Sequence, residues 1–247
     1  MSRLDSICDD VYLNMHLNTE MDLPQNRETL LHFFEAVQRH FPKMRNFYQR
    51  ERGEFVLEEE KEAGSHRWLS VDARRVCSGY INPPQLEDAL QLHQTVLDKV
   101  PYALSLSTLD CESLNLMYGF DFNYQGNHNE LLVNALGVMP GFERLLDVPG
   151  AKVVSHEPAV VLALDDDCRT QCRLNFEPRT TAVQLRTREF PEEQLSVYFT
   201  IRRYGSLEPG ESYPQVIEQL HQQAWKVLDE HVIDAVLKPL RQTIALR

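Results

Sequence analysis

The sequence predicts an α+β protein built from two related units, with an antiparallel sheet covered on one face by long helices. Three observations lead to this prediction: an internal repeat, a strand of alternating hydrophobicity and two long amphipathic helices. The chain has 247 residues, of which 43% are hydrophobic and 25% are charged. That is the composition of a globular protein with room for a substantial core.

The internal repeat appears when residue 13 is placed on residue 114. Segment 13–31 then lies on segment 114–132 without a gap. The identical residues are Leu13, Asn14, Asn26, Leu30 and Leu31 in the first segment and Leu114, Asn115, Asn127, Leu131 and Leu132 in the second. Chance would give about one or two identities. We interpret the repeat as a duplication; the alternative is that amphipathic β-α units resemble one another in any case.

The first unit, residues 1–100, is expected to have the order β-α-β-α. Its opening strand and helix are followed by two or three strands between Glu54 and Ile81, and then by a helix from about Pro84 to Val100. Residues 101–111 are expected to connect this unit to the second, residues 112–247.

The second unit opens on a clear strand, because apolar and polar residues alternate from Leu114 to Phe122. Asn127 is expected to cap a short helix whose third residue is Glu130. The remaining expected strands are 160–164, 170–177, 181–189 and 194–204, and a long amphipathic helix follows at 213–237. Pro239 is expected to break that helix.

The resulting β-α-β(2–4)-α order resembles the TATA-binding-protein-like or helix-grip topology, in which a curved antiparallel sheet holds a long helix. The resemblance lies in the order of the elements alone, and no signature residues of a family accompany it. It implies two units placed side by side around a pseudo-twofold axis, like a fused dimer.

Arginine and tyrosine gather on one face of the expected sheet in the second unit. The candidate ligand-binding or partner-binding residues are Arg169, Arg173, Arg186, Arg188, Tyr198, Arg202 and Tyr204. If their strands are neighbours, this face could receive a protein partner or a small anionic ligand. The alternative is a solvated face whose arginines pair with acids on adjacent strands.

Three functions from different classes follow. The first is a non-enzymatic binding or assembly module that uses this face. The second is a helix-grip small-molecule carrier or enzyme, with an apolar pocket between the sheet and the long helix. The third is an enzyme that uses arginines and a carboxylate on the sheet. No GxSxG, P-loop, GxGxxG or HExxH motif occurs. The sequence therefore favours a protein that is not an enzyme, without deciding the question.

No cofactor or metal site is expected. The nine histidines show no pair with ligand spacing, and Asp165, Asp166 and Asp167 lack the spacing of an EF-hand. His93 and His221 each lie in a Leu-His-Gln triplet on a predicted long helix, where we expect satisfied helical histidines.

The formal net charge of −12 disfavours nucleic acid as a partner, because phosphates would be repelled. No segment has the length or hydropathy of a membrane span, and no signal peptide is recognised at the start. Cys168 and Cys172 would lie too far apart on one strand for a disulfide, so the five cysteines are expected as reduced thiols in the cytoplasm. The sequence does not decide whether the protein forms a homo-oligomer.

Overall fold

The computed structural model describes residues 6–50, 53–61 and 64–246. Its strands are β1 (Asp10–Thr19), β2 (Asn46–Gln49), β3 (Phe55–Glu58), β4 (His66–Val71), β5 (Arg75–Ile81), β6 (Cys111–Gln125), β7 (Ala159–Ala163), β8 (Thr170–Glu177) and β9 (Glu192–Tyr204). Its α-helices are α1 (Arg27–Gln38), α2 (Leu86–Ala103), α3 (His128–Leu136), α4 (Ala182–Thr187), α5 (Tyr213–Val227) and α6 (Lys238–Ala245). Two short 3₁₀ segments, η2 (Thr108–Asp110) and η3 (Pro140–Leu145), and a π-helical segment, η4 (Leu228–Leu237), complete the described elements.

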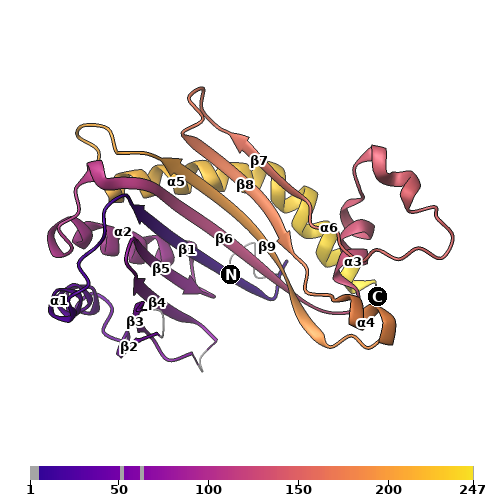
Figure 1. The fold of residues 1–247 in the computed structure, drawn as a ribbon, viewed down its shortest axis with the longest axis horizontal. Helices are drawn as coiled ribbons and strands as arrows, with labels where there is room; N and C mark the ends of the chain where they lie inside the picture. Colours follow the sequence, from indigo (N-terminus) through magenta and orange to yellow (C-terminus); the bar gives the residue numbers. More distant parts are fainter. Residues whose placement is uncertain (1–5, 51–52, 62–63, 247) are drawn as a thin grey trace.

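The nine strands form one antiparallel sheet in the order β2-β3-β4-β5-β1-β6-β9-β8-β7. The α+β class and the antiparallel sheet are therefore confirmed. The two halves of the chain meet where β1 pairs with β6, so both contribute to one continuous sheet. Helices α2 and α5 lie behind the sheet in Figure 1, which leaves the opposite face open.

The alternating pattern of β6 separates the two faces of the sheet. Its helix-side residues are all 1% exposed or less: Leu114, Leu116, Tyr118, Phe120 and Phe122. The residues between them point to the open face, because successive side chains on a strand alternate. The strand predicted from this alternation is confirmed, and it extends to Gln125.

The expected helix after Asn127 is confirmed as α3. The Asn127 side chain accepts a hydrogen bond from the backbone N–H of Asn129 at 3.1 Å. The helix ends at Gly137, whose φ of 76° is accessible at little cost only to glycine.

The strand expected at 181–189 is wrong, because these residues form helix α4 and its cap. Thr181 Oγ1 accepts from the Gln184 backbone N–H, and Gln184 Oε1 accepts from the Thr181 N–H at 2.6 Å. Arg188 then ends the helix with a φ of 62°.

Pro239 does not break the C-terminal helix, which is a second correction. The helix passes through the π-helical segment η4 and continues as α6, with Pro239 as its second residue. Pro239 has no N–H and so omits one hydrogen bond of this helix, and it lies just after the π-helical segment, where the regular i→i−4 pattern is already interrupted.

Both predicted helical histidines contact the sheet through Nδ1, and His221 is half-buried while His93 is fully buried, with its Nε2 left without a hydrogen-bond partner among the described residues. His93 Nδ1 lies 2.8 Å from Ser78 Oγ, and His221 Nδ1 lies 2.6 Å from the Tyr118 hydroxyl. Between the helices, Gln94 donates to Glu218 at 2.9 Å. These contacts fix α2 and α5 against the sheet.

Candidate functional site

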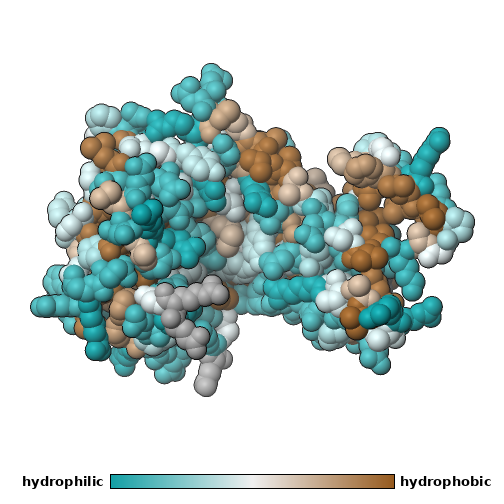
Figure 2. Space-filling model, viewed as in Figure 1, coloured by the Kyte–Doolittle hydropathy of each residue, from teal (hydrophilic) through white to brown (hydrophobic). Residues whose placement is uncertain are grey.

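The open face of the sheet contains a groove of about 290 Å³ over β6, β9 and β8. Strand register builds it, because Thr200 of β9 lies between Met117 of β6 and Arg173 of β8. Tyr198 and Arg202 flank Thr200 on the same face, since they are two residues away along the strand. Figure 2 shows this face, which is largely hydrophilic across the middle of the sheet.

Arg202 is held in position within the groove. Its Nε donates to Asn115 Oδ1 at 2.7 Å, and another guanidinium nitrogen donates to the Tyr204 hydroxyl at 2.8 Å. The guanidinium carbon also lies 5.3 Å from the centre of the Tyr204 ring. None of these partners is a carboxylate, so the positive charge is oriented but not neutralised.

Arg173 is exposed on β8 and lines the same groove. Within residues 6–50, 53–61 and 64–246, its guanidinium has no hydrogen bond or ion pair. The groove therefore contains two arginines without an acidic partner in the described chain, together with the hydroxyls of Tyr198, Thr200 and Tyr204.

His16 of β1 pairs with Asn115 and lies close to the Arg202 end of the groove. Burial, with Arg75 and Arg202 nearby, lowers the pKa of His16 to about 4. The imidazole is consequently neutral at pH 7, so it adds no charge to the two arginines.

A second polar cluster lies beside the groove, and only Tyr198 of its members was predicted. The Tyr198 hydroxyl donates to Glu177 at 2.7 Å, and the Tyr12 hydroxyl lies 3.4 Å from Asp121 Oδ1. Burial raises the pKa of Asp121, so this carboxyl takes up a proton more readily than an exposed aspartate. No local signal marks Tyr12 or Asp121, because they meet only when β1 pairs with β6.

Two glycines shape the floor of the open face. A Cβ added to Gly119 would lie 2.1 Å from the Tyr12 ring, and one added to Gly79 would lie 2.3 Å from the Trp68 indole nitrogen. Each aromatic side chain thus lies directly over a glycine of the neighbouring strand, a contact that any larger residue would prevent.

The seven predicted residues are not one cluster. Arg173, Tyr198, Arg202 and Tyr204 line the groove. Arg186 and Arg188 belong to α4 and its cap, because the expected strand there is a helix. Arg188 lines a different, larger pocket of about 860 Å³ beside α3.

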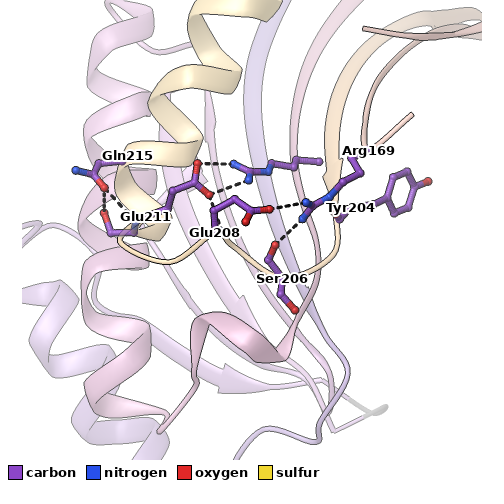
Figure 3. Close-up of polar contacts among 8 residues, drawn as sticks. Arg169, Tyr204, Ser206, Glu208, Glu211 and Gln215 are labelled. Atoms are coloured by element: carbon purple, nitrogen blue, oxygen red, sulfur yellow. Dashed lines mark hydrogen bonds and ion pairs between the residues drawn. The ribbon is translucent and has the colours of Figure 1, made fainter. Parts of the chain in front are cut away.

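Arg169 fastens the 205–212 loop, as Figure 3 shows. It donates to Glu208 at 2.6 Å and to the backbone oxygen of Ser206 at 2.7 Å. Next to it, Arg203 makes a double hydrogen bond with Glu211, at 3.0 and 2.7 Å. Arg169 and Arg203 therefore pair with acidic residues of this loop, and not with acids on adjacent strands.

Replacing Arg169 by alanine is expected to loosen this loop while leaving the groove intact. Removing contacts to Glu208 and Ser206 should speed amide exchange across 205–212, and should cost at most about 1 kcal/mol because the ion pair is solvent-exposed. Hydrogen exchange by mass spectrometry would measure the change. Unchanged exchange in the loop would contradict this role.

Within the described residues, no three His, Cys, Asp or Glu side chains converge so that they could hold a metal ion. None of the described helices is long and apolar enough to cross a membrane. All five cysteines are free thiols; Cys168 is exposed in the β7–β8 turn and the others are buried.

In comparisons with known proteins, no family model matches the chain, and no curated protein matches it in sequence.

Proposed function

We propose that this protein is a non-enzymatic binding module that captures an anionic group in the groove over β6, β9 and β8. The group is a carboxylate or a phosphate, carried by a small ligand or by a protein partner. The observation that carries this proposal is that Arg173 and Arg202 line one groove without a carboxylate partner in the described chain.

Acidic side chains are abundant in this protein, which makes the two unpaired arginines informative. The chain has 37 acidic residues against 25 lysines and arginines. Arg169, just before β8, and Arg203 of β9 are both paired with glutamates. An arginine fork is suited to a carboxylate or phosphate because it can donate two parallel hydrogen bonds.

The rest of the groove fits a small ligand or a single acidic side chain. Its volume of about 290 Å³ is at the lower end of ligand pockets. The hydroxyls of Tyr204 and Thr200 supply further donors, while Met117 and Val161 offer apolar contact.

The alternative, a carrier with an apolar pocket between the sheet and the long helix, is less favoured. Large side chains fill that space: Tyr118 from the sheet and Tyr213 and Leu220 from α5 are all 2% exposed or less. A ligand there would have to displace close-packed core residues.

Titration with inorganic phosphate and with succinate, at constant ionic strength, tests the proposal. We expect both anions to bind the wild type, and Arg173→Ala and Arg202→Gln to weaken binding at least about tenfold, because each removes a charge-assisted hydrogen bond. Isothermal titration calorimetry would measure the affinities.

Arg188→Ala is the matched control, because it removes an arginine from α4 and leaves the groove unchanged. Absence of phosphate and succinate binding to the wild type, or equal weakening by Arg188→Ala, would contradict the proposal.

We also infer that the chain descends from a duplicated unit with a TATA-binding-protein-like or helix-grip-like topology. The shift that relates the repeats places Met15 on Leu116, and Met15 lies directly opposite Leu116 in the β1–β6 pairing. A pseudo-twofold axis through that pair would relate β5, β4 and β3 to β9, β8 and β7, which are arranged outward from β1 and β6 in the same order. It would also relate α2 to α5, which contact each other.

A further inference from the structure

Strand β7 forms one end of the sheet and has an unusually apolar surface. It pairs with β8 on one side, and no described strand pairs with its other side. All five residues from Ala159 to Ala163 are exposed. Val160, Val161 and Leu162 are 48%, 54% and 53% exposed, and Figure 2 shows a hydrophobic patch over this strand.

The backbone of β7 can accept another strand. Leu164 donates its N–H to the oxygen of Thr170 at 2.8 Å, so Leu164 points its backbone groups toward β8. Because hydrogen-bonding direction alternates along an antiparallel strand, the N–H and C=O groups of Val161 and Ala163 point to the free edge. Monomeric proteins usually protect such an edge with a charged residue or a proline. Neither lies between Ala159 and Leu164.

The other half of the sheet shows how such a position is covered. Strand β3 is three strands out from β1, as β7 is from β6, and it is fully buried. Its outer edge is covered by the antiparallel strand β2. The Phe47 ring of β2 lies 6.2 Å from the Phe55 ring of β3 and 5.5 Å from the Phe34 ring of α1. Strand β7 has no equivalent of β2 among the described residues.

We propose that β7 is covered by β7 of a second copy of this chain, paired antiparallel across a twofold axis so that the sheet continues from one copy into the other. Such an interface is self-complementary, because each copy presents the same apolar strand. It also removes two unprotected edges at once.

Charge favours this antiparallel arrangement. Each β7 is followed by the acidic turn 165–167 and preceded by a segment whose single lysine, Lys152, is balanced by Glu157. Antiparallel pairing brings the acidic turn of one copy toward the segment without net charge of the other and keeps the two acidic turns at opposite ends. Parallel pairing would place the two acidic turns side by side, which is unfavourable.

The test is the oligomeric state of the intact chain, measured by sedimentation velocity between about 1 and 200 μM, a range chosen because short interfaces are weak. We expect a concentration-dependent dimer for the wild type. Ala163→Pro removes an outward N–H, and Leu162→Lys places a charge in the patch; both should be monomers with unchanged circular dichroism. Neither residue lines the groove over β6, β9 and β8.

Val183→Lys is the matched control, because Val183 is 54% exposed on α4 and lies outside the edge. It should dimerise like the wild type. A wild type that stays monomeric over the whole range, or an Ala163→Pro variant that dimerises like the wild type, would overturn the proposal.

Hydrogen exchange separates strand pairing from contact through side chains alone. The amides of Val161 and Ala163, which point to the free edge, should exchange slowly in the wild-type dimer and rapidly in the Leu162→Lys monomer. Equal exchange in the two proteins would overturn the strand pairing. Leu162→Lys should still bind phosphate with wild-type affinity, so failure of the dimer and failure of the anion site are distinguishable.

Discussion

Lowering the pH from about 6.5 to about 5 is expected to reduce the free energy of unfolding by about 3 kcal/mol, because two histidines are held neutral in the folded protein. Burial, with Arg75 and Arg202 nearby, lowers the pKa of His16 to about 4. Complete burial against the sheet lowers the pKa of His93 to about 3.

The direction of the effect follows from which state binds protons. An unfolded histidine has a pKa of about 6.5, so the unfolded chain takes up protons in this pH window while His16 and His93 in the folded chain do not. Each pH unit then removes up to about 1.4 kcal/mol of stability per histidine. The free energy of unfolding is therefore highest above about pH 6.5, and it decreases as the pH falls toward the folded-state pKa values of His16 and His93.

Other groups change the size of the effect but not its sign. The pKa values of His66, His128 and His221 are also lowered, mainly by burial, and these residues add to the loss. The raised pKa of Asp121 acts in the opposite direction, because its folded state binds a proton more readily. The window lies above the ordinary carboxyl range of about 4, so exposed acids contribute little.

Urea unfolding followed by circular dichroism at pH 7, 6 and 5 would measure this dependence. His93→Gln should reduce the dependence of the unfolding free energy on pH by the contribution of one of the two histidines. His231→Gln should leave it unchanged, because the His231 side chain is 70% exposed. A wild type equally stable at pH 7 and pH 5 would show that His16 and His93 accept protons without loss of the fold.

Gly119→Ala is expected to lower the free energy of unfolding by about 1–3 kcal/mol, because the added methyl group overpacks the open face. The new Cβ would lie 2.1 Å from Cε2 and 2.2 Å from Cζ of Tyr12. The Tyr12 ring would have to leave, and it would lose its edge-on contact with Tyr198, where the ring centroids are 6.4 Å apart. The contact of its hydroxyl with Asp121 would be lost as well.

A double-mutant cycle isolates this clash. In a Tyr12→Ala background, Gly119→Ala should cost much less, because no ring lies over residue 119. Gly141→Ala is the control, since no atom lies within 4 Å of a Cβ at that position. Equal costs of Gly119→Ala with and without the Tyr12 ring would rule out the clash as the cause.

His16 and Gly119, one residue from each prediction, lie on the open face beside the proposed anion site, whereas His93 lies on the helix side of the sheet. His16 pairs with Asn115, which holds Arg202, and Gly119 pairs with Tyr198. The open face beside the groove therefore contains a half-buried histidine and a close aromatic contact that both affect the stability of the fold.

The features that the sequence by itself determined are local. The alternation from Leu114 to Phe122 predicts β6 and its two faces, because successive side chains of a strand point to opposite faces and this pattern can be recognised in a short run of residues. Asn127 likewise predicts the start of α3, since a capping side chain acts within three residues. The α+β class follows from such segments taken together.

Only the tertiary structure decided what distant residues do to one another. Residues 181–189 alternate like a strand yet form α4, whose start is stabilised by the capping box of Thr181 and Gln184. Arg169, just before β8, is neutralised by Glu208, while Arg173 of β8 is left without an acid in the described chain. Pairing across a sheet or with a loop depends on contacts between remote segments, and no local pattern records which arginine such a contact will neutralise.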